Sequence, residues 1–274
     1  MLDFSKLGFI PLLFLDDGHG AETPGKRTPA FPDGKVIREN IWNKSVILLI
    51  EKDAQRLGFK TMLTAPEDSD TSLKTRTDRA NAAWAAYVKQ LRAQGIKLAD
   101  PQKAAILYSQ HYNAMVSTWD GSKAEGDGSH YYPGSMEGKK LAAAVQKYIS
   151  QGTKQLNRGI IESDFHMLRE SAMPAVLNEA GFMDDPREAA LMVDTSFQKE
   201  TATQALMGIC EYYGLVYEPE RIQTREEEAV NAAVGAGLIH DKVYWEDVLT
   251  GKRPVDLSYL TQVFLNAEGL IKSK

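Results

Sequence analysis

The sequence predicts an α/β fold: a mostly parallel, mixed sheet with helices on both faces, followed by a small C-terminal helical module. Short apolar runs alternate along the chain with longer stretches of helical periodicity, which is typical of parallel strands joined by helices. The strand signals stop near residue 217, where a Tyr-Glu-Pro-Glu segment is typical of a linker. We therefore expect one large domain over residues 1–217 and a separate small module over residues 222–274.

The first half of the domain begins with an apolar run at 7–15, which we interpret as a buried strand. Residues 39–57 place apolar side chains at helical spacing and stop at Gly58, a typical helix end. A second strand is expected at 59–63. The Ala-rich stretch at 72–93 then predicts a long helix.

In the second half, the apolar run at 104–108 predicts a buried strand that ends before a polar loop. A helix follows at 136–148. Another short strand begins at 175–177, after Pro174, and the last helix of the domain covers 197–213. In the C-terminal module, helical patterns occur at 226–234, 243–249 and 257–267.

Composition excludes several classes of protein. A hydrophobic fraction of 43% with 25% charged residues is ordinary for a globular chain and disfavours disorder. The net charge is 32 minus 37, or −5, with no basic block, so no nucleic-acid partner is expected. Since Cys210 is the single cysteine, neither an intrachain disulfide nor a cysteine-based zinc cluster can form.

The apolar run at 7–15 is also the only candidate for a targeting segment. It is much shorter than the ~20 residues of a membrane-spanning helix, so we expect no membrane association. A single lysine precedes the run, and acidic residues follow it where a signal peptide would carry small residues for cleavage. We therefore expect a protein made in the cytoplasm without a signal peptide.

Three titratable residues follow predicted strands. His19 comes directly after the first strand, His111 after the strand at 104–108, and Glu179 after the strand at 175–177. Because the carboxyl ends of parallel strands meet at one edge of a sheet, these side chains should converge on one crevice. We expect ordinary surface or packing roles for the other histidines, His130, His166 and His240.

Two histidines and a carboxylate are the ligands of many catalytic zinc sites, and zinc lowers the pKa of a bound water to about 7. The alternative is that each histidine is a hydrogen-bonded loop residue. The residues alone leave the third ligand open. Glu22 lies three residues from His19 in a loop, whereas Glu39 begins a predicted helix, where a carboxylate also favours the helix dipole.

Four sequence blocks together resemble one known family. They are DDGHG at 16–20, RENIWN at 38–43, SQHYN at 109–113 and MLRESAMPAVLNEAGFMDD at 167–185. In this order they resemble the zinc-dependent N-acetylmuramoyl-L-alanine amidases, which cut peptidoglycan between the lactyl group of muramic acid and the L-alanine of the stem peptide. The likeness covers roughly residues 8–215, and agreement over several blocks is much more specific than a single motif.

The resemblance implies a function and a site. Its zinc ligands fall on His19, Glu39 and His111, and its catalytic glutamate falls on Glu179, which would pass a proton from the attacking water to the leaving amine. Arg76 is among the supporting matches. The expected substrate is peptidoglycan and the expected cofactor is Zn²⁺. The alternatives are a zinc peptidase that cuts within stem peptides and a non-catalytic protein that binds the cell wall.

Two departures from the family pattern concern the site. Gln110 and Tyr112 flank His111 where the family has an aliphatic residue and alanine, and they could alter the cleft. The loop at 25–29 could line the substrate groove or merely cover the sheet, and we favour the second.

The C-terminal module and the expected lack of a signal peptide suggest where and how the protein acts. The module at 222–274 could bind the wall, dimerise the protein or cap the catalytic domain, so a dimer through this module is one expectation and the oligomeric state stays open. A wall hydrolase without a signal peptide fits a phage endolysin, or an autolysin, that reaches the cell wall after release.

Overall fold

The computed structural model describes residues 1–119, 123–220, 230, 232–239, 241–249, 252 and 263. The chain divides into two compact units, Met1–Glu218 and Pro219–Lys274. The sequence-based boundary at 217 lies next to this division. The division alone does not test what the second unit does, so the roles expected for that unit stay predictions.

The first unit is built around one six-stranded sheet with the strand order β2-β1-β3-β6-β4-β5. The strands are β1 (Leu12–Asp16), β2 (Lys60–Leu63), β3 (Ala105–Asn113), β4 (Asp127–Tyr131), β5 (Asn157–Glu162) and β6 (Ala175–Phe182). Neighbouring strands are parallel except β4 and β6, which are antiparallel. The sheet is thus mixed and mostly parallel, as the sequence predicts.

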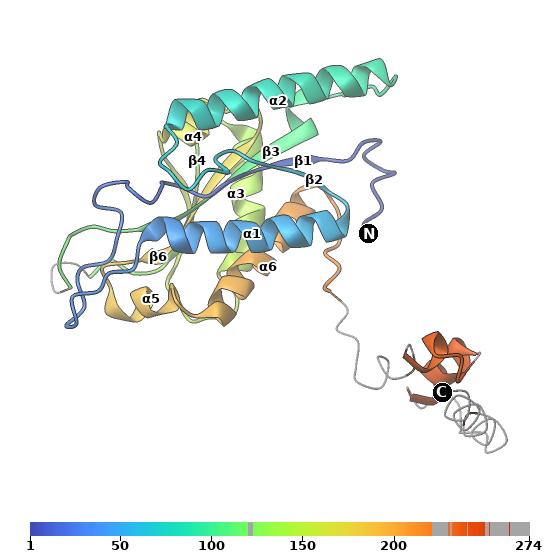
Figure 1. Cartoon of the computed structure of the whole chain (residues 1–274). Helices are drawn as coiled ribbons and strands as arrows, with labels where there is room; N and C mark the ends of the chain where they lie inside the picture. The colour runs from blue at the N-terminus through green and yellow to red at the C-terminus, as the bar shows by residue number, and fades with distance from the viewer. Residues whose placement is uncertain are drawn as a thin grey trace. The chain divides into compact units, whose positions relative to one another are not determined.

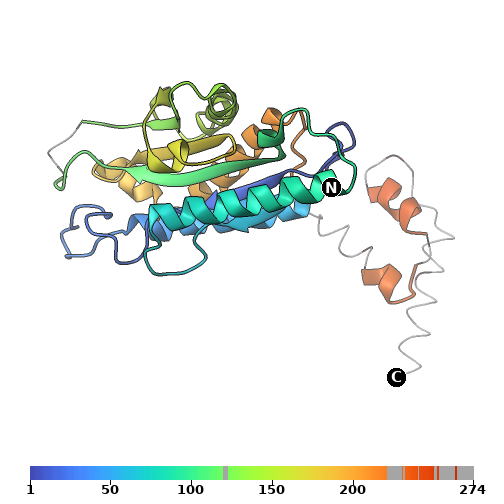
Figure 2. The same ribbon diagram turned by 90° about the horizontal axis from the view of Figure 1, so that it is seen from above.

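Helices cover both faces of this sheet. The helices α1 (Glu39–Leu57), α3 (Met136–Ile149) and α6 (Thr195–Tyr212) pack together on one face, and α2 (Leu73–Ala93) and α4 (His166–Arg169) pack on the other. Figure 1 shows α1 and α2 running along the sheet on its opposite sides, and in the view from above in Figure 2 α2 lies in front of α1. Each face has its own buried apolar cluster, because the strand side chains alternate between the two faces. The short helices η1 (Pro101–Ala104) and α5 (Pro186–Leu191) complete the unit.

Local sequence explains the long helices. Helix α1 ends where expected because Gly58 adopts a left-handed conformation with φ of 95°, which lets its N–H cap the last turn. Helix α2 begins after Ser72, whose side chain accepts a hydrogen bond from the Thr75 N–H. Helix α6 begins after Asp194, which caps the N–H groups of Ser196 and Phe197.

Two expectations about strands are wrong. The strand expected at 7–15 is shorter, because residues 5–8 form a turn and β1 starts at Leu12. The strand expected to end at Tyr108 continues to Asn113. The sequence becomes polar there, but the polar side chains stay buried because they have hydrogen-bond partners: Ser109 donates to Asp16 and Gln110 donates to Asn178.

The sequence analysis also missed β4 and β5. Strand β4 has the sequence Asp-Gly-Ser-His-Tyr, in which apolar side chains are scarce, yet all of its residues are buried. It is inserted between β5 and β6, so pairing on both sides holds it in the sheet rather than an apolar pattern of its own.

In the second unit, the helix expected at 243–249 is present as α8 (Lys242–Leu249). Its Tyr244 is buried and packs edge-on against Trp245, with 5.4 Å between ring centroids. The other two expected helices, at 226–234 and 257–267, lie mostly outside the described residues, and so does His240. Among the described residues, none of the helices combines the length and apolar character needed to span a membrane.

Candidate metal centre

His19 lies on the loop that leaves β1, and its backbone is unusual. Its φ of 62° is the only positive value among the non-glycine residues that the structure describes. The Arg76 guanidinium donates a hydrogen bond to the His19 carbonyl oxygen, with an N–O distance of 2.7 Å. The conformation is held by a neighbouring side chain, as strained backbone in a site generally must be.

Glu39 is the first residue of α1, and its carboxylate is almost completely buried, with 1% of the side chain exposed. Its Oε1 atom accepts hydrogen bonds from the Tyr112 backbone N–H at 3.1 Å and from the Asn43 side-chain amide at 3.3 Å. These donors fix the carboxylate. The Asn43 amide also donates to the Gly18 carbonyl oxygen, which ties α1 to the loop that carries His19.

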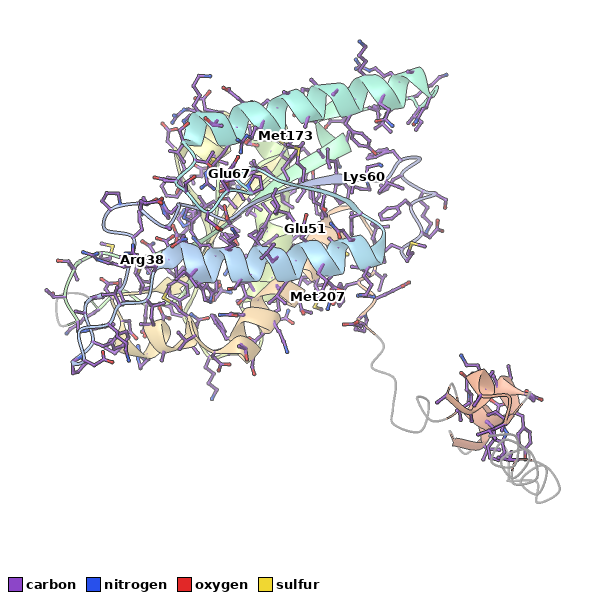
Figure 3. The ribbon with its side chains drawn as sticks, in the orientation of Figure 1. Arg38, Glu51, Lys60, Glu67, Met173 and Met207 are labelled. Carbon is purple, nitrogen blue, oxygen red and sulfur yellow. The ribbon has the colours of Figure 1, made fainter. Side chains whose placement is uncertain are left out.

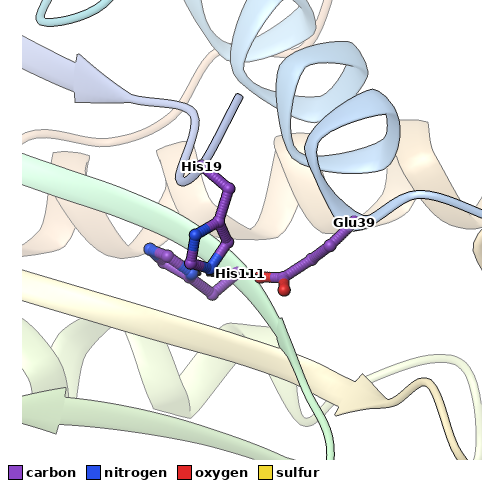
Figure 4. Close-up of side chains that lie close together, drawn as sticks. All are labelled: His19, Glu39 and His111. Carbon is purple, nitrogen blue, oxygen red and sulfur yellow. Dashed lines mark hydrogen bonds and ion pairs between the residues drawn. The ribbon is translucent and has the colours of Figure 1, made fainter. Parts of the chain in front are cut away.

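His111 lies within β3, next to these two residues in space (Figure 4). Its Nδ1 atom is 3.0 Å from Glu39 Oε1, and His19 Nε2 is 3.4 Å from the same oxygen. The two imidazole rings meet edge to face with 4.9 Å between their centroids. One ligand atom from each of the three residues lies within 4.8 Å of the others.

The donor set fits a metal ion. His19 Nε2 and Glu39 Oε2 are buried and have no hydrogen-bond partner within the described part of the chain. Buried polar atoms are rarely left unsatisfied, so unpartnered ones call for an explanation, and a bound ion is one. Two imidazoles and one carboxylate are a common zinc set that leaves a position open for water. His19 and His111 are 17% and 11% exposed, so solvent reaches this edge of the cluster.

Glu179 lies beside the cluster because β3 and β6 pair in register. His111 is directly opposite Glu179 in this pairing, so the two side chains project from the same face of the sheet. Its Oε2 atom is another buried oxygen without a hydrogen-bond partner within the described residues. Burial raises the pKa of Glu179 to about 7 in the protein without metal. A carboxylate with such a pKa can both accept and release a proton near neutrality.

Burial and the neighbouring charges together set the pKa values of Glu39, His111 and His19. Burial disfavours the charged form of Glu39, but the hydrogen bond with His111, the close contact with His19 and the charges of both histidines outweigh it, so the pKa of Glu39 lies below its usual value. Burial likewise opposes protonation of His111, yet the contact with Glu39 raises the pKa of His111 overall. For His19, burial is the larger effect and lowers the pKa. Low pKa values for Glu39 and His19 keep both groups in the forms that bind metals.

A buried ionic network lies beneath the histidines. Arg76 is 1% exposed and its Nη1 atom donates to Asp16 and to Asp17, with both N–O distances at 2.9 Å. Asp16 also accepts hydrogen bonds from Thr64 at 2.5 Å and from Ser109 at 2.6 Å. The network joins β1, β3 and α2, and through the hydrogen bond from Arg76 to the His19 carbonyl oxygen it stabilises the loop that carries His19.

The residues predicted from the sequence meet as follows. Glu39, and not Glu22, lies with the two histidines, because Glu22 is exposed and accepts a hydrogen bond from the Asp70 N–H at 3.1 Å. His111 and Glu179 lie within strands rather than after them. That His19, Glu39 and His111 act as ligands, and that Glu179 acts in catalysis, stays a prediction.

The side chains of the two departures beside His111 point away from the predicted ligands. Strand residues alternate between faces, so Gln110 and Tyr112 point to the face opposite His111. Gln110 is fully buried and contacts Asn178, and the Tyr112 hydroxyl donates to the Glu188 carbonyl oxygen at 2.6 Å.

Two further histidines have packing partners. His130 Nδ1 is 2.7 Å from Ser163 Oγ, and its ring lies against Phe165. His166 Nε2 is 3.2 Å from Thr77 Oγ1.

The loop at 25–29 is the element that sequence analysis misjudged. Its Lys26 lies beside the cluster, with 4.0 Å between Nζ and Glu39 Oε2, so the loop does more than cover the sheet. No spacing rule identifies this lysine in the sequence, because the contact depends on how the loop pairs with the residues before α1.

Comparisons with known proteins point to one family. The family model described as N-acetylmuramoyl-L-alanine amidase matches residues 13–211. The germination-specific N-acetylmuramoyl-L-alanine amidase of Bacillus subtilis is 26% identical over 208 residues, which are 74% of this chain and 79% of that protein. The endolysin of Bacillus phage SPP1 is 30% identical over 210 residues, covering 74% of this chain and 66% of that protein.

Solved structures show the same likeness. The N-acetylmuramoyl-L-alanine amidase from Clostridium difficile 630 superposes with a TM-score of 0.60 and 28% identity, over 75% of this chain and 97% of that one. The matched region corresponds to the first unit, which contains all four predicted site residues.

Proposed function

The chain belongs to the N-acetylmuramoyl-L-alanine amidase family, and from this premise we propose that it is a zinc-dependent hydrolase of peptidoglycan. The bond cleaved would be the amide between the lactyl group of muramic acid and the L-alanine of the stem peptide. The observation that carries the proposal is the convergence of His19, Glu39 and His111 beside Glu179, within the region that the family model matches.

In this proposal, His19, Glu39 and His111 hold the zinc ion. Bound zinc supplies Lewis acidity, which polarises the substrate carbonyl and lowers the pKa of water. The Asp16–Arg76 network and the donors to Glu39 keep these side chains in place before the substrate arrives.

Glu179 carries the proton. It accepts a proton from the attacking water, whose oxygen forms the new bond to the acyl carbon. It then donates that proton to the alanine nitrogen as the carbon–nitrogen bond breaks. The first products are the lactyl carboxylic acid and a peptide with a new amino group. The acid then loses its proton and the amine takes one up, so atoms and charges balance.

Product identification tests the proposal. Purified peptidoglycan is digested with the protein, with a chelator, and with chelator followed by zinc, and the products are examined by mass spectrometry. Stem peptides with a new N-terminal L-alanine, absent with chelator and restored by zinc, are expected. Cleavage elsewhere in the peptide would identify a peptidase instead, and the absence of products from several wall types would favour a wall-binding protein.

We also propose that the protein is an endolysin or autolysin that reaches the wall after release from the cell. The 30% identity to the phage SPP1 endolysin supports this proposal. The culture medium of intact producing cells should then lack the protein, and its accumulation there before lysis would contradict the proposal.

The second unit is proposed to bind the cell wall, to dimerise the chain or to cap the catalytic unit. Comparing the full chain with residues 1–218 distinguishes these roles by sedimentation with purified walls, by molar mass in solution and by specific activity.

A further inference from the structure

The loop before α1 holds Lys26 against the metal centre through backbone pairing. Arg27 and Arg38 form an antiparallel bridge, and the Glu39 N–H donates to the Lys26 carbonyl oxygen at 3.1 Å. The Thr28 N–H continues the pairing by donating to the Ile37 carbonyl oxygen at 2.9 Å, and the Ile37 N–H donates to the Thr28 side-chain hydroxyl at 3.0 Å. Figure 3 labels Arg38 at the beginning of α1, next to Glu39. The position of Lys26 is therefore set by backbone hydrogen bonds and not by a flexible tip.

The Lys26 ammonium lies on the solvent side of the cluster. Its Nζ atom is 4.0 Å from Glu39 Oε2, whereas both histidines contact the other carboxylate oxygen, Oε1. The Lys26 side chain is 43% exposed. The lysine is close enough to the reaction centre to contact a bound substrate.

The position of Lys26 is unfavourable for metal binding. A dication held by Glu39 and the histidines would be repelled by the nearby ammonium, because like charges at such distances interact unfavourably even with solvent present. Lys26 therefore does not help to hold the metal. An anionic group on the substrate would offset the repulsion.

The chemistry of the substrate says where such a group lies. The acyl side of the scissile amide is an uncharged ether-linked sugar derivative. The amine side is a peptide, and the residue after L-alanine carries a free α-carboxylate when it is D-glutamate and a neutral amide when it is D-isoglutamine. We propose that Lys26 is a specificity-determining residue that pairs with this stem-peptide carboxylate. The proposal rests on the amidase function proposed above.

The test compares two substrates that differ at one group. Muramoyl-L-Ala-D-Glu and muramoyl-L-Ala-D-isoGln are assayed with the full-length zinc protein and with Lys26→Met. The wild type should prefer the carboxylate substrate in kcat/KM by about fivefold, the size of a partly exposed ion pair. Lys26→Met should lose that preference through a higher KM for the D-Glu substrate and should leave the D-isoGln substrate unchanged.

Two controls separate this role from others. Lys26→Arg keeps the charge and should retain part of the preference. Lys35→Met removes a lysine of the same loop that is paired with Asp33 at 3.0 Å, and it should retain all of it. Zinc affinity, measured by competition with a chromogenic chelator, should be equal or tighter in Lys26→Met.

Each other outcome overturns the proposal in a recognisable way. An equal loss of kcat on both substrates would place Lys26 at the reacting amide. No change on either substrate would leave it without a role in recognition, and weaker zinc binding would make it part of the metal centre. If the wild type cleaves neither substrate at the muramoyl–alanine bond, the amidase function itself fails, which the wild-type assay alone reveals.

Discussion

The Arg76 guanidinium donates a hydrogen bond to the carbonyl oxygen of His19 across 2.7 Å, and so connects a buried ionic network with a predicted metal ligand. Arg76 reaches His19 while its Nη1 atom contacts Asp16 and Asp17. A planar guanidinium can make all of these contacts at once, but an ammonium group cannot. Arg76 is therefore a positioning residue for His19.

The first prediction concerns Arg76→Lys. The charge that Asp16 needs is kept, so the protein should still fold, but the contact with the His19 carbonyl is lost. Zinc affinity should fall by about 10-fold or more, as for other residues that orient a metal ligand. Arg79→Lys is the matched control, because partly buried Arg79 pairs with Glu67 and donates to the Thr64 carbonyl oxygen, but it donates to none of the predicted ligands. Competition titrations and unfolding curves measure both effects, and wild-type zinc affinity in Arg76→Lys would contradict the prediction.

The fold was predictable wherever apolar periodicity decides the structure. Helix α1 occupies the expected residues 39–57 because its apolar spacing and the glycine after it agree. Strand β4 and the second half of β3 were not predictable in this way, because buried hydrogen bonds replace apolar contacts there. Ser109, for example, is fully buried, and Asp16 on the neighbouring strand accepts a hydrogen bond from its hydroxyl.

The site was predictable in part. Position after a strand indicated His19, His111 and Glu179, and family resemblance indicated Glu39. The residues alone could not choose between Glu39 and Glu22, since both follow His19 in the sequence and only the fold of the loop between them determines which one lies next to it. The position of Lys26 could not be predicted either, because its contact with Glu39 also depends on the fold of this loop.

The second prediction concerns Gly18→Ala. A Cβ atom at Gly18 would lie 2.4 Å from His111 Cε1 and 2.6 Å from His111 Nε2, so the imidazole would have to move. We expect loss of most zinc binding. Gly8→Ala is the control, because Gly8 also has a positive φ, 73°, but has no atom within 4 Å of the new Cβ. It should cost about 1–2 kcal/mol of stability and leave zinc binding intact. Equal zinc affinity in the two variants would argue against this packing.

The third prediction concerns Glu179→Gln. The amide has the shape of the carboxylate but cannot accept the proton of the attacking water. We expect kcat to fall by about 10²–10⁴. Zinc should remain bound at wild-type stoichiometry, as metal analysis of the purified variant can show. Residual activity near that of the wild type would remove Glu179 from the proton transfer.

The fourth prediction concerns stability and pH. Burial, with smaller contributions from Arg158 and His111, lowers the pKa of His130 to about 4 from 6.5. Below pH 6.5 the unfolded chain binds a proton at His130, whereas the folded protein binds it only near pH 4. The contribution of neutral His130 to the unfolding free energy is therefore fully present above pH 6.5 and is lost between pH 6.5 and pH 4. From pH 7 to pH 5 the loss due to His130 should be about 2 kcal/mol.

His130→Asn provides the measurement for this effect, because its amide can still contact Ser163 but does not titrate. Denaturant unfolding of both proteins, with chelator present, is compared at pH 7 and pH 5. The wild type should lose more unfolding free energy than the variant between the two. Parallel losses would show that His130 does not cause the acid sensitivity.

The fifth prediction uses the two glutamates between which the sequence could not decide. Zinc that binds only the folded state should raise the unfolding free energy by about 2.7 kcal/mol at a free concentration of 100 times Kd. Glu39→Gln removes the buried charge between His19 and His111, so this stabilisation should largely disappear. Glu22→Gln alters an exposed side chain that contacts only the Asp70 N–H in the described structure, so the stabilisation should persist. Thermal unfolding with zinc and with chelator distinguishes the two variants. A zinc response that survives in Glu39→Gln but is lost in Glu22→Gln would exchange their assignments.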